Sequence, residues 1–211
     1  MKNKILVSIC IPTLGRPEKL HRLLAAIKEN AGYDNYEVIV KADEFPPNNV
    51  GAPTMLKRCV DESKGELVMF LGNDVVPKKD FLQEAVWKMY RRFPEGDGMI
   101  GLNDEYWQER HVAPHWIASK KLLPMLDGEF FHTGYNHTGC DNELKARVEA
   151  VGKYAWAEKA KIWHDHPMMA GSKDQMDEFY AQAYSGPRHD ADDKLYAERA
   201  AKYGFADRVW A

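Results

Sequence analysis

The sequence has few cysteines and no long apolar run. Its three cysteines, Cys10, Cys59 and Cys140, are widely spaced and form no CxxC pair, which excludes a disulfide framework and a zinc knuckle and fits a reducing cytoplasm. No stretch approaches the roughly 20 apolar residues that a membrane-spanning helix needs. The apolar run 5–11 is short and lacks a small-residue cleavage site, which favours a strand over a signal peptide. We therefore expect a cytoplasmic protein without a transmembrane segment.

An excess of charge of either sign is also missing. The 29 Lys and Arg residues stand against 32 Asp and Glu residues, and a net charge of -3 gives no general attraction to nucleic acid or to an anionic membrane. Three basic pairs, Lys78-Lys79, Arg91-Arg92 and Lys120-Lys121, leave a nucleic-acid partner open as an alternative. Solvated helix faces explain these pairs more simply.

A glycine-rich phosphate loop is the third absence. The segment 12–17 lacks the glycine spacing of a P-loop or of a dinucleotide fingerprint, and the Arg- and Lys-containing glycine loop of nucleotidyltransferases is missing too. The segment nevertheless lies between an apolar run and a helical pattern. Backbone N–H groups and the helix dipole favour an anion at such a place, to which Arg16 could add a charge, and a simple helix start is the alternative.

What the chain does have is an alternation of strands and helices. With 211 residues and 45% hydrophobic content, it can bury one sizeable core. Short apolar runs predict strands over 5–11, where Pro12 ends the strand, over 36–40, over 66–71 and within 111–119. Helical spacing predicts helices from Pro17 onward, over 53–62, 78–92 and 141–151, and two more within 171–211. The pattern predicts a three-layer α/β/α fold with a mostly parallel central sheet, whose ligands bind at the carboxyl ends of the strands.

One buried strand runs directly into polar residues. Asn73 and Asp74 follow the run 66–71, and an acid at that edge is well placed to bind a hard divalent cation through oxygen. Such a cation can clamp a diphosphate. The alternative is that Asp74 caps the helix that begins near Pro77 or Lys78.

These motifs resemble those of family 2 and related GT-A glycosyltransferases. The resemblance is carried by Val7-Ser8-Ile9-Cys10-Ile11-Pro12-Thr13 and by Lys64-Gly65-Glu66-Leu67-Val68-Met69-Phe70-Leu71 followed by Asn73-Asp74, and it spans roughly residues 4–167. It implies a Rossmann-like nucleotide-diphospho-sugar transferase fold with C-terminal helices. It also implies a hexosyltransferase-like enzyme that uses Mn²⁺ or Mg²⁺ and transfers a sugar from a nucleoside-diphosphate sugar, with a UDP-sugar favoured, to an acceptor hydroxyl. The implied organisation is a transferase domain over 1–167, with a nucleotide-sugar half (1–97) and an acceptor half (98–167), and a helical extension over 168–211.

A second run, 139–147, with Gly152 and the strand 162–166 after it, is similar to the same family. By this resemblance Asp141 is the base that deprotonates the acceptor in an inverting single displacement, and His164 joins Asp74 in the metal site. An N-terminal cap is the alternative for Asp141, since Thr138-Gly139-Cys140-Asp141 fits a capping box. We expect His164 and His166 to point in opposite directions, so that only one reaches the metal, with His166 in reserve.

The chain also departs from the family pattern. Gly72 stands where the first acid of Asp-x-Asp belongs, so the metal site is expected to rest on Asp74, a histidine and the diphosphate. A non-catalytic nucleotide- or carbohydrate-binding module of the same fold therefore stays open, and nucleotide-sugar hydrolysis would separate it from an enzyme. The expected donor-binding residues are Pro12, Thr13, Arg16, Asp43, Lys57 and Asn73, and the expected acceptor residues are Trp116 and Asn136.

Overall fold

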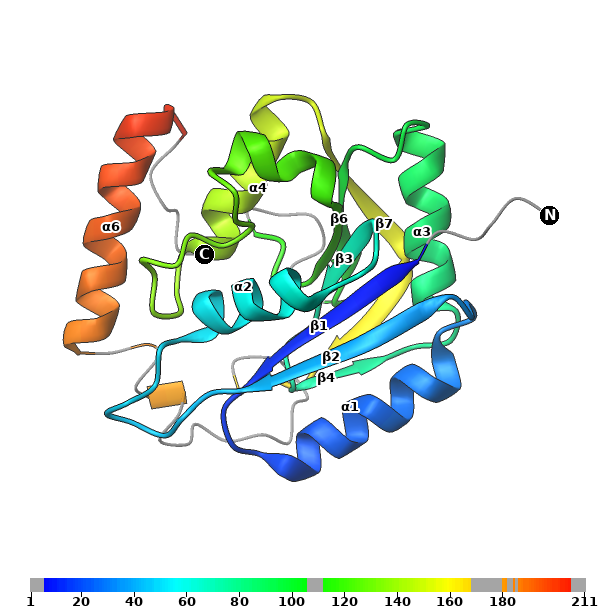
Figure 1. The fold of residues 1–211 in the computed structure, drawn as a ribbon, viewed down its shortest axis with the longest axis horizontal. Coiled ribbons are helices and arrows are strands. Elements are labelled where there is room, and N and C mark those ends of the chain that lie inside the picture. The colour runs from blue at the N-terminus through cyan, green and yellow to red at the C-terminus, as the bar shows by residue number, and fades with distance from the viewer. Residues whose placement is uncertain (1–5, 106–111, 168–179, 182–183, 185, 206–211) are drawn as a thin grey trace.

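The computed structural model describes residues 6–105, 112–167, 180–181, 184 and 186–205 (Figure 1). Its elements in chain order are β1 (Val7–Thr13), α1 (Pro17–Asn30), β2 (Tyr36–Ala42), α2 (Ala52–Glu62), β3 (Leu67–Phe70), β4 (Val75–Pro77), α3 (Phe81–Arg92), β5 (Met99–Asn103), β6 (Trp116–Ser119), the 3₁₀ helix η1 (Lys120–Leu126), α4 (Cys140–Ala150), β7 (Tyr154–His164) and α6 (Pro187–Tyr203). The strands form one sheet in the order β2-β1-β3-β6-β5-β7-β4. Five of these seven described strands run in one direction, and β6 and β4 run against them. The predicted mostly parallel sheet is confirmed.

Two apolar layers lie on opposite faces of this sheet. On one face Ile9 and Ile11 pack with α1 and α3, and on the other face Cys10 and Val68 pack with α2 and α4. The alternation along β1 is what places its odd and even residues on the two faces. All residues of β1 are buried, which explains why its sequence is mostly apolar, with Ser8 and Thr13 as the polar exceptions. The cysteines at 10, 59 and 140 are buried, and none of the three forms a disulfide.

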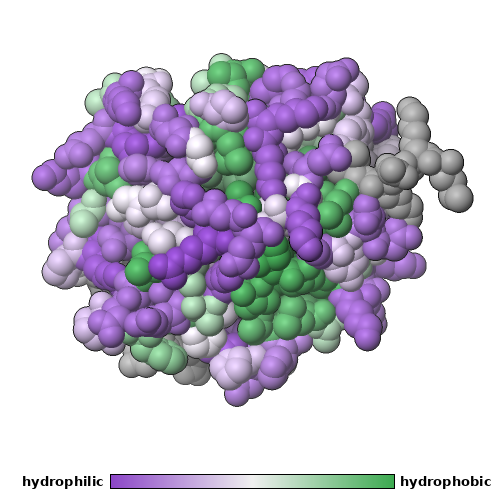
Figure 2. Space-filling model, in the orientation of Figure 1, coloured by the Kyte–Doolittle hydropathy of each residue, from purple (hydrophilic) through white to green (hydrophobic). Residues whose placement is uncertain are grey.

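β2 lies at the edge of the sheet and is only half-covered. Figure 2 shows apolar surface over this strand, where Val38 and Val40 are each 36% exposed. Among the described residues, no helix combines the length and the apolar content needed to cross a membrane.

Three local predictions need correction. β1 continues through Pro12 to Thr13, because β3 ends opposite Cys10 and leaves this part of β1 paired with β2 alone, where a proline is tolerated. The sequence also gives no sign of the three-residue strand β4, which pairs antiparallel with β7. α3 therefore begins only at Phe81, after Asp80, so Asp74 caps no helix.

The C-terminal helix α6 packs on α4 through a buried ionic cluster. Glu143 of α4 is 3% exposed and accepts hydrogen bonds from Arg199 Nε (2.7 Å) and Nη2 (2.6 Å) and from the Tyr135 hydroxyl (2.9 Å). Of the two terminal helices predicted within 171–211, α6 is one; residues 171–179 lie outside the described residues.

We expect Glu143→Ala to lower the free energy of unfolding by about 3–5 kcal/mol, because the buried Arg199 guanidinium loses the carboxylate that accepts two of its hydrogen bonds and keeps only Asp127 at 3.5 Å. Urea unfolding followed by circular dichroism measures this change. Glu198→Ala is the matched control on α6, since its ion pair with Lys194 is solvent-exposed and is expected to contribute less than about 1 kcal/mol. Equal losses in the two variants would contradict the assignment of the cluster as the main link between α4 and α6.

Candidate active site

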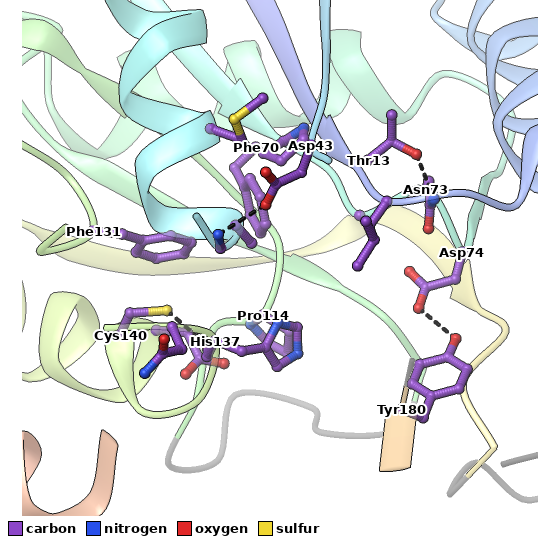
Figure 3. Close-up of a pocket in the computed structure, with 18 of the residues that line it drawn as sticks. Thr13, Asp43, Phe70, Asn73, Asp74, Pro114, Phe131, His137, Cys140 and Tyr180 are labelled. Atoms are coloured by element: carbon purple, nitrogen blue, oxygen red, sulfur yellow. Dashed lines mark hydrogen bonds between the residues drawn. The ribbon is translucent and has the colours of Figure 1, made fainter. Parts of the chain in front are cut away.

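A cavity of about 240 Å³ opens at the carboxyl ends of the parallel strands. Its wall is built from the segments that follow β1, β2, β3 and β7, from the segments that precede β6 and α4, and from the start of α6 (Figure 3). Of the residues proposed from the sequence, those that line it are Pro12, Thr13, Arg16, Asp43, Asn73, Asp74, Asn136, Asp141 and His164. This is the edge at which open α/β sheets bind their ligands.

Three buried side chains in this cavity form a group that fits a metal ion. Asp74, His115 and His164 each offer one ligand atom, and the three atoms lie within 4.8 Å of one another. His115 was missed as a ligand by sequence reasoning. It precedes β6, and because β6 is antiparallel, its amino end lies at the edge where the parallel strands have their carboxyl ends.

The glycine at position 72 makes room for this group. A Cβ atom at Gly72 would lie 2.6 Å from Asp74 Oδ1 and 3.2 Å from His115 Nε2. The side chain of His115 therefore approaches the place where the first acid of an Asp-x-Asp motif would begin. One carboxylate and two imidazoles form a donor set that suits Mn²⁺ and neighbouring transition ions.

The electrostatics of the group also favour a cation beside Asp74. Burial alone would raise the pKa of Asp74, but the charge of His164 and hydrogen bonds from His164 and Tyr180 outweigh it and hold this pKa well below its usual value. Burial opposes the charged form of His164 as well, yet Asp74 and Asp104 raise its pKa to about 9. Burial and the neighbouring His164 charge lower the pKa of His115 to about 3, so that its imidazole is neutral. Asp74 is thus ionised, and a metal ion that used His164 as a ligand would have to displace the proton of its imidazole.

Asp104 and Tyr180 lie next to this group of three residues. The Asp104 carboxylate, at the end of β5, lies 3.9 Å from His164 Nδ1, on the side opposite the Nε2 atom that faces Asp74 at 3.6 Å. This separation is an ion-pair distance and is longer than a hydrogen bond. The Tyr180 hydroxyl donates to Asp74 Oδ2 at 2.9 Å, and the Arg16 guanidinium stacks on the Tyr180 ring, 3.8 Å from its centre (Figure 3).

The loops after β1 and β2 shape the other side of the cavity. Asn73 Nδ2 donates to the Thr13 hydroxyl at 2.7 Å, which joins the end of β1 to the stretch after β3. The Asp43 carboxylate accepts the backbone N–H groups of Glu44 (2.9 Å), Val50 (3.0 Å) and Gly51 (2.8 Å), so it orders the loop from β2 to α2.

Asp141 lies in the first turn of α4 and faces the same cavity. Its Oδ1 accepts the N–H of Asn142 at 2.9 Å. The predicted capping box does not form, because Gly139 is the N-cap residue and the Thr138 hydroxyl contacts His189 and Asp192 instead. The sequence alternative of a box-type cap for Asp141 is therefore wrong.

Three expectations about the site are corrected. Lys57 does not line the cavity; its ammonium bonds Asp61 at 2.8 Å on the exposed face of α2. Trp116 is fully buried in the core against Phe70, with ring centroids 5.7 Å apart, because the face of β6 that it occupies is covered. His164 and His166 do not point in opposite directions: β7 ends at His164, both rings line the cavity, and their centroids lie 5.4 Å apart.

The sheet order, the helices on both faces and the cavity at the carboxyl edge define an α/β protein whose cavity lies where open α/β sheets bind their ligands. No protein-family model matches the sequence, and no curated protein matches it. Solved structures do match the fold. The mannosyltransferase PcManGT from Pyrobaculum calidifontis, in complex with GDP-Man and Mn²⁺, has a TM-score of 0.64 at 15% identity, over 95% of this chain and 74% of that chain.

Two further solved structures match the same fold. S. aureus TarS 1-349 in complex with UDP-GlcNAc has a TM-score of 0.60 at 13% identity, over 95% of this chain and 73% of that chain. The Drosophila galactosyltransferase 7 mutant in complex with manganese, UDP-Gal and xylobiose has a TM-score of 0.56 at 12% identity, over 87% of this chain and 81% of that chain. The match to a longer TarS chain covers only 36% of that chain. The protein therefore has the GT-A fold.

Proposed function

We propose that the protein is a metal-dependent glycosyltransferase that transfers a sugar from a nucleoside-diphosphate sugar to an acceptor hydroxyl. The observation that carries the proposal is the placement of Asp74, His115 and His164 as one buried group in the cavity that Asp141 also lines. The GT-A structures in complex with UDP-GlcNAc, GDP-Man and UDP-Gal support it, and two of them also hold manganese. Asp74, His115 and His164 would hold Mn²⁺ or Mg²⁺, with Mn²⁺ favoured by the two imidazoles.

In this proposal Asp141 is the general base. It takes the proton of the acceptor hydroxyl while the acceptor oxygen forms a bond to the anomeric carbon, and the bond from that carbon to the diphosphate breaks with its electron pair on the leaving oxygen. A single displacement of this kind inverts the anomeric centre. When bound, the metal ion would offset the charge of the departing diphosphate.

The donor would lie on the side built by residues 1–97. Thr13 and Asn73 join the two strand ends beneath it, Asp43 orders the neighbouring loop, and Arg16 adds a positive charge to the wall. A UDP-sugar is the favoured donor. Residues 98–167 would form the acceptor side with Asn136, and the extension 168–211 contributes Arg188 and Asp192 to the cavity wall.

Nucleotide-sugar hydrolysis tests the proposal without a known acceptor, because many transferases release sugar to water slowly. The purified chain is incubated with Mn²⁺ and UDP-, GDP-, CDP- or TDP-sugars, and released nucleoside diphosphate is measured. We expect turnover with at least one donor and none with EDTA. Binding of a donor without any turnover, even with a broad set of acceptors, would favour the non-catalytic module instead.

His115→Ala is expected to raise the dissociation constant for Mn²⁺ by at least about 10- to 100-fold, the range that even outer-sphere partners of a metal contribute. Electron paramagnetic resonance of free Mn²⁺ measures the affinity. His21→Ala, an exposed histidine of α1, is the matched control and should leave it unchanged. Unchanged Mn²⁺ affinity in His115→Ala would remove His115 from the site.

A further inference from the structure

Two loops meet across the cavity, one from each half of the chain. The loop from β2 to α2 reaches the segment before α4 at Gly51, where a Cβ atom would lie 2.2 Å from the Asn136 carbonyl oxygen. Gly51 also has a φ of +91°, which a side chain would oppose. The relative position of these loops fixes the width of the cavity between the donor side and Asp141.

The first loop is held by Arg188 of α6. Its guanidinium donates two hydrogen bonds to Asn49, from Nη1 to the side-chain oxygen at 2.6 Å and from Nη2 to the backbone oxygen at 2.8 Å. Asp43 holds the same loop from β2 through the N–H groups of Val50 and Gly51. The loop is therefore fixed at adjacent residues from two elements that are far apart in the sequence.

The second loop is held by Asp192, four residues along the same helix. Its carboxylate is 1% exposed and accepts the backbone N–H groups of Asn136 (2.7 Å), His137 (2.9 Å) and Thr138 (2.8 Å). The Asn136 side chain donates to it as well, at 3.0 Å. These residues lead directly into Gly139, the N-cap of α4, and so to Asp141.

The remainder of α6 makes contacts of its own with the body of the protein. Arg199, two turns further on, bonds Glu143 of α4, and Tyr196 lies in the core. The buried Asp192 carboxylate accepts three N–H groups of one loop, and it lies one helical turn from Arg188, which donates to the opposite loop. We therefore assign these two residues to the shape of the cavity rather than to the attachment of the helix.

We infer that Arg188 and Asp192 are positioning residues that set the donor-side loop and the Asp141 loop against each other, so that α6 completes the active site. The inference rests on the proposed function. Because the two residues hold different loops, their substitution should have different kinetic effects: Arg188 acts on donor binding and Asp192 acts on the alignment of the base.

Kinetics of nucleotide-sugar hydrolysis test this difference. For Arg188→Ala we expect a rise in donor KM of about tenfold with little change in kcat, and for Asp192→Asn a fall in kcat of about 10- to 100-fold with little change in donor KM, because a displacement of about 1 Å costs this much. Lys194→Ala, on the exposed face of α6, is the control and should change neither constant. Arg188→Lys should recover part of the donor affinity. If both variants showed the same fall in kcat together with the same rise in donor KM, the inference would be overturned in favour of a purely structural role.

Hydrogen exchange of the unliganded protein separates a failure of the inference from a failure of the proposed function. Arg188→Ala should speed exchange of the amides of Val50 and Gly51, and Asp192→Asn should speed exchange at residues 136–138, with the unfolding midpoint of each variant measured in parallel. Unchanged exchange at these amides would overturn the positioning role even in an active enzyme. Changed exchange in a protein that turns over no nucleotide-sugar would refute the proposed function and leave the positioning of the loops intact.

Discussion

Asp141→Asn is expected to lower kcat by about 10³-fold while the affinity for the nucleotide stays within about twofold of the wild type, since a positioned general base contributes about 10²- to 10⁴-fold. Asn keeps the shape of the side chain and still accepts the N–H of Asn142 through its oxygen, so α4 keeps its first turn. What is lost is the ability to take a proton from the acceptor. Steady-state release of the nucleoside diphosphate gives kcat, and calorimetry gives the affinity.

Glu149→Gln is the matched control for this experiment, because Glu149 lies on α4 with a side chain that is 57% exposed and outside the cavity. It should retain the wild-type kcat. If Asp141→Asn kept most of the wild-type kcat, the base would have to be another group, and His137, which lines the same cavity, would be the next residue to replace.

The second large effect is expected from Asp74→Asn, which should abolish the metal dependence of nucleotide binding and lower kcat/KM by about 10³-fold or more. The substitution keeps the volume but removes the negative charge that faces His164 at 3.6 Å. Calorimetric titration of the nucleotide with and without Mn²⁺ measures the first effect, and donor hydrolysis measures the second.

Asp61→Asn serves as the control for Asp74→Asn. The Asp61 carboxylate is exposed on α2, and in the described part of the chain its hydrogen bonds come from Lys57. It should bind the nucleotide with the wild-type metal dependence. An Asp74→Asn protein whose nucleotide affinity still rises on addition of Mn²⁺ would show that the metal is held elsewhere.

The parts of the site that the sequence predicts are those that follow parallel strands. Thr13 is the last residue of β1 and Asp74 lies four residues after the end of β3, and parallel strands bring such positions to a common edge. His164 ends a long strand in the same way. Periodicity predicts the common edge for Thr13 and Asp74, whereas the place of His164 in the metal site was expected from the resemblance to GT-A glycosyltransferases.

The residues that the sequence does not predict come from elements that break this rule. His115 reaches the edge because β6 is antiparallel, and a four-residue strand carries no signal of its direction. Its position directly before the apolar run Trp116–Ser119, together with the loss of an acid at Gly72, is the cue that could have indicated it. Trp116 itself was placed in the cavity for its aromatic chemistry, although the strand turns it into the core.

Tyr180, Arg188 and Asp192 contact the site from the C-terminal extension. Their partners Asp74, Asn49 and Thr138 lie 106, 139 and 54 residues away in the sequence. The contacts of Arg188 and Asp192 depend on how α6 docks, to which the buried Glu143–Arg199 cluster contributes, rather than on a local pattern. A helical extension could therefore be predicted, but its contribution to the cavity could not.

Calorimetric titration of UDP into the wild-type protein, with and without Mn²⁺, tests the central claim most directly. The account predicts that UDP binds with Mn²⁺ and that the affinity falls by at least about tenfold in EDTA, because Asp74, His115 and His164 would hold an ion that offsets the charge of the diphosphate. The contrary result is a protein that binds none of UDP, GDP, CDP and TDP with Mn²⁺ present, or that binds one of them equally well without the metal.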